Sequence, residues 1–137
     1  MTTINATKGE FVNLINGLFT VQELKGKKFS LTVSKNITIL QKELKDLEEF
    51  GKPSKEFMDL AQKVNGIANE EADDSKERID KLESENKNLV KERRAQIDEV
   101  AKLMEDEIKL DLHILSEDIL PEDITAKQNK SLEKIIE

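Results

Sequence analysis

The chain has 137 residues, of which 37% are charged and 36% hydrophobic, and its formal net charge is −7. This charged share is well above the usual quarter, so solvated helices are expected rather than a large compact core. The acidity and the scarcity of aromatic residues disfavour binding to a nucleic-acid polymer, and the lack of cysteine excludes disulfides and thiol catalysis.

The sequence also carries no sign of a membrane segment. No apolar run approaches the roughly 20 residues that a transmembrane helix needs. The first ten residues, MTTINATKGE, lack the charged and then apolar pattern of a signal peptide. We therefore expect a single domain over residues 1–137, located in the cytosol.

A first helix is predicted over residues 7–25. Thr7 and Glu10 have the spacing of a capping box, and Gly26 suits the end of the helix. Gly17 weakens the helix by about 1 kcal/mol relative to alanine, and is either simply tolerated or a point where another helix approaches closely. An apolar stripe at helical spacing supports this helix: Phe11, Leu14, Ile15, Leu18 and Val21.

The next segment has two interpretations. Residues 29–33 alternate apolar and polar side chains as a β-strand does, but steps of three and four continue much further, as in a helix. The longer pattern favours a helix over 30–50 that ends at Gly51, and the strand stays open as an alternative. The helical stripe consists of Phe29, Val33, Asn36 or Ile37, Leu40, Leu44 and Leu47.

A third helix is predicted over 54–68, with Ser54 as its cap and a stripe at Phe57, Leu60, Val64 and Ile67. The acidic segment that follows is interpreted either as a turn or as continuous helix. A long helix of about 50 Å is then predicted over 75–107. It has a coiled-coil-like seam, in which a polar residue can fix register and oligomeric state. The seam begins with Ile79, Leu82, Asn86 and Leu89.

Residues 108–115 have the two-residue period of a half-buried strand, with Leu112 on its apolar face. Its backbone groups need a partner strand. Three partners are open: the same strand of a second subunit, the segment KFSLTV, or a short N-terminal strand through Thr3 and Ile4. A last helix is predicted over 125–136, and Thr125 and Gln128 at its start have the spacing of a capping box. The predicted fold is mainly α, an elongated helical hairpin or coiled-coil-like domain with one or two short β-strands near the C-terminus.

No catalytic constellation, metal site or cofactor site is predicted, since the single histidine, His113, has no evident catalytic partners. Two basic clusters are candidate ligand-binding residues for a small anionic nucleotide: Lys27 with Lys28, and Arg93 with Arg94. Each cluster also has a structural explanation. Lysines near a helix C-terminus complement its dipole, and arginines on a coiled coil pair with neighbouring glutamates.

The apolar stripes exceed what one short bundle easily buries, so a homo-oligomer is expected. The candidate interface residues are Ile79, Leu82, Asn86, Leu89 and Leu112.

The sequence resembles small proteins of unknown function that tailed bacteriophages encode. The likeness lies in the opening stretch from NATKGEFVNL to KDLEEF, with its Lys-rich turn and the tetrapeptide SKNI, and in the C-terminal SLEKIIE. The resemblance implies a non-catalytic binding protein, either a stoichiometric antagonist of host defence, such as an oligomeric sponge for an anionic nucleotide signal, or an adaptor that binds another phage protein.

Overall fold

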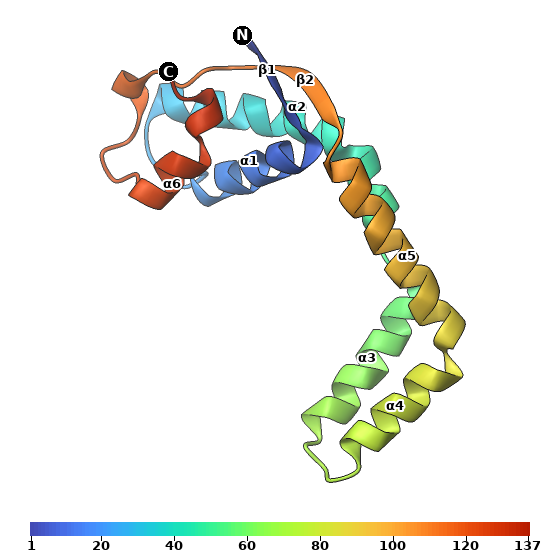
Figure 1. The fold of residues 1–137 in the computed structure, drawn as a ribbon. Coiled ribbons are helices and arrows are strands. Elements are labelled where there is room, and N and C mark those ends of the chain that lie inside the picture. Colours follow the sequence, from blue (N-terminus) through green and yellow to red (C-terminus); the bar gives the residue numbers. More distant parts are fainter. The chain divides into compact units, whose positions relative to one another are not determined.

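The computed structural model describes residues 1–137 and divides into two compact units, residues 1–47 with 102–137 (unit 1) and residues 48–101 (unit 2) (Figure 1). The two boundaries fall inside helices. The elements in chain order are β1 Thr2–Thr7, α1 Lys8–Thr20, α2 Lys27–Gly51, α3 Lys55–Asn69, α4 Ser75–Glu85, α5 Lys87–Met104, β2 Glu107–Leu112 and α6 Ala126–Ser131, with short 3-10 helices η1 Glu117–Ile119 and η2 Glu133–Ile135.

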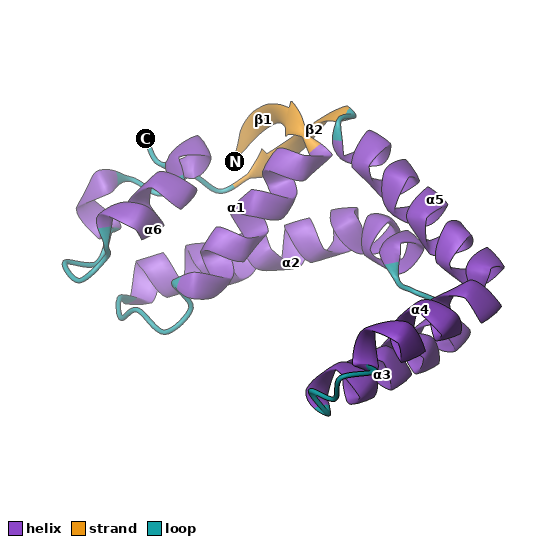
Figure 2. Ribbon diagram, turned by 60° about the horizontal axis from the view of Figure 1, so that its bottom comes forward, coloured by secondary structure: helices purple, strands orange, loops and turns teal.

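Unit 1 contains a two-stranded antiparallel sheet (Figure 2). β1 pairs with β2, and the register places Ile4 opposite Leu110 and Thr3 opposite Asp111. The N-terminal segment is therefore the partner of the predicted strand. The other two partners considered for residues 108–115, a second subunit and the segment KFSLTV, are therefore wrong. The period-two signal was correct, although β2 begins one residue earlier and ends at Leu112.

The first helix starts as predicted. The Thr7 side chain accepts the Glu10 backbone N–H, and the Glu10 carboxylate accepts the Thr7 backbone N–H, which completes a capping box. α1 ends at Thr20 rather than 25, because the Val21 N–H bonds to the carbonyl of Leu18 in a tighter turn. The predicted stripe is confirmed, since its five side chains are all buried.

Residues 27–51 form a helix throughout, so the strand alternative for 29–33 is wrong and the helix begins three residues before its predicted start. Its stripe of three- and four-residue steps is buried along its whole length. The stripe includes Asn36, whose side-chain amide donates to the His113 carbonyl and accepts the His113 N–H, both at 2.8 Å. This amide thereby pairs with the backbone just beyond β2 as a neighbouring strand would.

The C-terminal segment completes the core of unit 1 with the buried side chains of Leu132 and Ile135. Thr125 and Gln128 form the predicted capping box, but α6 ends at Ser131 and the 3-10 helix η2 replaces the rest of the predicted 125–136 helix. The Leu115 N–H then donates to the Ile135 carbonyl at 2.7 Å, and a parallel bridge joins Leu115 to Ile136.

In unit 2, α3 and α4 lie side by side as an antiparallel hairpin (Figure 1). Ser54 caps α3 by accepting the Phe57 N–H, and the turn at 70–74 contains Glu71 with a positive φ of 50°. The turn interpretation of this acidic segment is therefore confirmed. Arg78 of α4 forms ion pairs with Glu70 and with Asp74, which closes the turn.

The predicted continuous helix over 75–107 is wrong, because the helix is interrupted at Asn86, between α4 and α5. The Asn86 side chain donates to the Leu82 carbonyl at 2.9 Å, and its backbone N–H bonds to the carbonyls of Leu82 and Glu83. Asparagine competes in this way with the helical backbone, and Ser84 and Asn88 nearby also have low helix propensity. The residue that we placed in a coiled-coil seam therefore ends α4.

The predicted class is confirmed in its coarse form, a mainly helical protein with a small amount of sheet. The location of the sheet is corrected, since one strand lies at the N-terminus and one near the C-terminus. None of the helices combines the length and the hydrophobicity required to cross a bilayer.

Candidate functional site

Arg93, the first of the two predicted arginines, is engaged within unit 2. Its guanidinium donates to the Gly51 carbonyl at 2.8 Å and to the Gln96 side chain at 2.9 Å, and it lies 5.8 Å from the ring centre of Phe57. The Gln96 amide donates to the carbonyls of Phe50 and Lys52. These two side chains of α5 therefore satisfy carbonyls at the C-terminal end of α2, which have no partner within the helix.

A cavity of about 300 Å³ adjoins this arrangement in unit 2. It lies at the N-terminus of α3 beside the Ser54 cap, and the aromatic ring of Phe57 forms part of its wall. The side chain of Glu92 also lines it and disfavours an anionic occupant. The residues around the cavity are Lys52, Ser54, Phe57, Leu89, Glu92, Arg93 and Gln96.

Arg94, the second arginine, is exposed and does not line this cavity. Lys27 and Lys28 belong to unit 1, where both are exposed in the first turn of α2. The dipole explanation considered for these two lysines is wrong. They lie at the start of α2 and not at the end of α1, so they add positive charge where a helix is already positive. No acidic residue occupies that turn.

The first turn of α2 continues into a row of lysines that the sequence analysis missed. Lys35, Lys42 and Lys45 are exposed on the same helix, and their separations of seven and three residues place them with Lys28 on one face. In the sequence this row is a seven-residue repeat of lysine at Lys28, Lys35 and Lys42, interleaved with the stronger apolar stripe of the same helix.

The predicted interface residues have different environments. Ile79, Leu82, Asn86 and Leu89 are half-buried in unit 2. Leu112 is completely buried in the core of unit 1, so a second chain has no access to it.

Unit 2 is poorly buried as a whole. All the buried hydrophobic side chains of the protein except that of Leu60 belong to unit 1. Phe50, Met58 and Ile97 are between 47% and 50% exposed, and neither α4 nor α5 has any buried residue. Comparison with known proteins adds no relative to this description, since no family model, curated protein or solved structure matches the chain.

Proposed function

We propose that this protein is a non-catalytic binding protein of phage type, which acts in the host cytoplasm as a stoichiometric antagonist of a defence component. The observation that carries the proposal of an oligomeric binding protein is the apolar surface of unit 2, where Met58 and Ile97 are about half exposed and Ile79, Leu82 and Leu89 are only partly buried. Such a surface in a hairpin with a single buried side chain is typical of an element that is completed by another protein. The resemblance to small phage proteins supplies the biological setting.

The partner on this surface is a second copy of the chain. α3 and α4 form a two-helix hairpin, and two such hairpins together supply the four helices of a bundle with a shared core, to which the unit 2 part of α5 adds Ile97. A two-fold contact of this kind places the same apolar residues of both copies against each other.

Light scattering at tens of micromolar tests this proposal by measuring the mass in solution. We expect a dimer or larger oligomer, which the double variant Met58→Asp/Ile97→Asp dissociates. Both side chains are about half exposed, so the change leaves the helices folded, as circular dichroism would record. Lys63→Asp is the matched control on the same unit and keeps the oligomer. A wild-type monomer at this concentration contradicts the proposal.

Sequestration of an anionic nucleotide is a second candidate function, and the cavity beside Ser54 is its site, although Glu92 in the lining opposes an anion. The cavity combines two cationic side chains with an aromatic wall, which are groups that bind phosphate and base. Arg93 is unsuitable for a charge-reversal test, because its loss would also release the carbonyl of Gly51.

Calorimetry with a panel of cyclic and linear nucleotides tests sequestration. Lys52→Glu should abolish the binding heat, because it reverses a positive charge in the cavity lining. The fold should be kept, since the Lys52 side chain is exposed and takes no part in the helix-end hydrogen bonds. Arg94→Glu and Lys27→Glu/Lys28→Glu test the remaining predicted residues. The absence of heat with every nucleotide removes this candidate and leaves protein binding, including the alternative role as an adaptor for another phage protein.

A further inference from the structure

The charge of α2 is distributed very differently from that of the whole chain. Between Glu23 and Glu43 the sequence has five lysines and no aspartate or glutamate, although the protein carries a net charge of −7. Four of these lysines and Lys45 lie on α2. Most of this stretch without acidic residues therefore lies on a single helix, in the part of it that belongs to unit 1.

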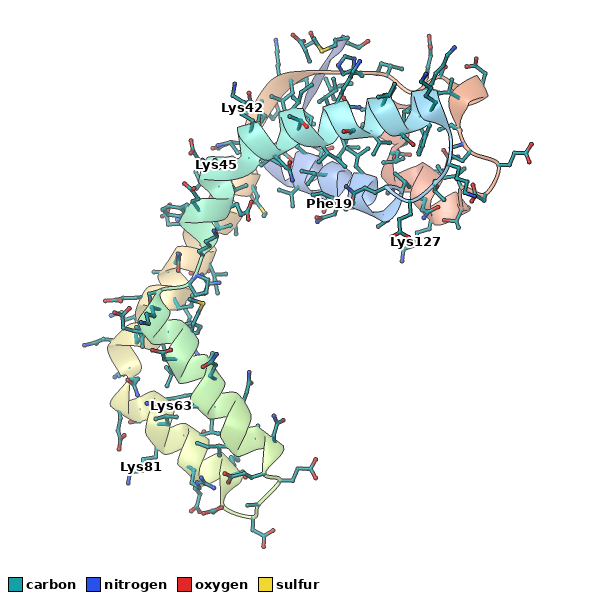
Figure 3. All side chains as sticks on the ribbon, turned by 180° about the vertical axis from the view of Figure 1, so that it is seen from behind. Phe19, Lys42, Lys45, Lys63, Lys81 and Lys127 are labelled. Carbon is teal, nitrogen blue, oxygen red and sulfur yellow. The ribbon has the colours of Figure 1, made fainter.

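The lysines share one exposed face of the helix. The residues of this face follow one another at steps of three and four, and all of them are exposed. The face lies opposite the buried stripe that includes Phe29 and Leu40. Figure 3 shows Lys42 and Lys45 projecting from this helix. At 1.5 Å per residue the face is about 26 Å long. We call it the lysine face, and it consists of Lys28, Leu31, Lys35, Thr38, Lys42 and Lys45.

Stability does not account for the lysine face. None of its lysines takes part in an ion pair, although Glu43 and Asp46 flank its C-terminal end. Lys28 lies in the first turn of α2, where a positive side chain is unfavourable because of the helix dipole. Leu31 adds an apolar side chain that is 52% exposed within the row.

We propose that the lysine face is a docking surface for an acidic helix of a protein partner. Two helices that lie along one another meet at steps of three and four residues, which is the spacing of this face. A partner helix with carboxylates at the same steps would place them opposite Lys28, Lys35 and Lys42, with Leu31 against its apolar part. This surface is separate from the apolar surface of unit 2 and does not depend on self-association.

The chemistry of the face favours a protein over a nucleic acid. It has no arginine to bind phosphate oxygens in pairs and no aromatic ring on which a base stacks. The acidity of the rest of the chain opposes a uniformly charged polyanion more than a local carboxylate patch. Attraction between exposed charges mainly steers association, so binding should weaken strongly as salt is added.

Fluorescence anisotropy with a synthetic helix tests the proposal. The probe is a labelled 21-residue Ala-rich peptide with glutamates at alternating steps of three and four. A peptide of the same composition in scrambled order and a 20-base-pair DNA duplex are its competitors. We expect the full-length protein to bind the ordered peptide at low salt, with at least tenfold preference over the other two.

The variant Lys28→Glu/Lys35→Glu should weaken peptide binding about tenfold or more, because attraction becomes repulsion at two positions. The same variant should melt at an unchanged or higher temperature, since a glutamate in the first turn of α2 complements the helix dipole. Opposite effects on binding and on stability distinguish a lost surface from a lost fold.

Lys63→Glu/Lys127→Glu is the matched control, with the same change of charge on exposed lysines outside the lysine face (Figure 3). It should keep the affinity of the wild type. Equal loss in the control, equal binding of the scrambled peptide, or preference for the DNA duplex would each overturn the proposal, and the last would identify a nucleic-acid surface instead.

Discussion

Asn36 shows how a single polar residue can be part of an apolar stripe. Its side chain is completely buried, and both of its amide hydrogen bonds go to the backbone of His113. The spacing of the stripe could be read from the sequence, which left Asn36 and Ile37 as equal candidates for one step. Both are buried. The partner of the amide lies 77 residues away, and no local pattern indicates it.

Replacement of Asn36 by leucine should therefore destabilise the protein, despite the apolar surroundings. The change leaves the N–H and the carbonyl of His113 without partners, at a cost of about 2 kcal/mol or more. Urea denaturation measures this difference. Asn13→Leu, on the exposed side of α1, is the control and should change stability by less than about 0.5 kcal/mol. Similar values for the two variants would mean that the hydrogen bonds to His113 contribute little.

Gly17 and Gly66 differ in the space available for a side chain, and this difference gives a second prediction. Both are helical, but a β-carbon at Gly17 would lie 2.7 Å from the Ser131 hydroxyl oxygen, whereas nothing lies within 4 Å at Gly66. Gly66→Ala should stabilise the protein by about 0.5–1 kcal/mol through helix propensity. Gly17→Ala should destabilise it by about 1–2 kcal/mol, because the clash outweighs the same gain.

A double-mutant cycle tests the cause of the Gly17 effect. Ser131→Gly removes the atoms nearest to the new methyl group, so it should recover most of the loss in the Gly17→Ala background. Additive effects of the two changes would show that α6 does not limit the space at Gly17. Of the two interpretations that the sequence left open for this glycine, close approach by another segment is thus the one the structure supports.

At the scale of elements, local signals predicted most helices and strands but not their partners. Capping boxes at Thr7 and Thr125 located two helix starts, and the period of two located β2. The N-terminal strand through Thr3 and Ile4 was only one of three open partners for β2, because TTINAT has few apolar residues and lies far from β2 in the sequence. The interruption of the helix at Asn86 could not be predicted, because an asparagine in a heptad seam is equally typical of a continuous coiled coil.

The start of α1 is connected to the C-terminal segment by an ion pair that gives a pH-dependent prediction. The Lys134 ammonium lies 2.6 Å from the Glu10 carboxylate, which also accepts the Thr7 N–H. These contacts, the hydrogen bond from Lys134 foremost, lower the pKa of Glu10 from its usual 4.5. A lowered pKa means that the folded state binds this proton less readily than the unfolded state does.

The contribution of Glu10 to stability is consequently complete above about pH 4.5 and disappears as the pH falls through the lower folded-state pKa. Glu10→Gln should lower the melting temperature at pH 7, and the difference from the wild type should narrow between pH 5 and pH 3. Lys134→Ala should reduce the same pH dependence, since it removes the main cause of the shift. A constant difference between wild type and Glu10→Gln over this range would contradict the assignment.

At the scale of the whole molecule, the distribution of burial distinguishes the two units. The sequence predicted stripes along α1, α2 and α3 alike, and their spacing gives no information on how completely each is covered. In unit 1 the stripes meet a sheet and the C-terminal segment. In unit 2 the stripe of α3 meets only helices with no buried residue, and Leu60 is its one buried member.

The two units should therefore differ in their rates of amide hydrogen exchange in dilute solution. Amides of α3 and α4 should exchange at least tenfold faster than those of α1 and the N-terminal half of α2, because fewer apolar contacts are lost when unit 2 opens. Raising the protein concentration should slow exchange in unit 2 alone if a second copy covers its apolar surface, since association stabilises the bound form by mass action. The double variant Met58→Asp/Ile97→Asp should abolish this concentration dependence and leave exchange in unit 1 unchanged. Equal protection of both units in dilute solution would show that the half-exposed side chains of unit 2 do not limit its stability.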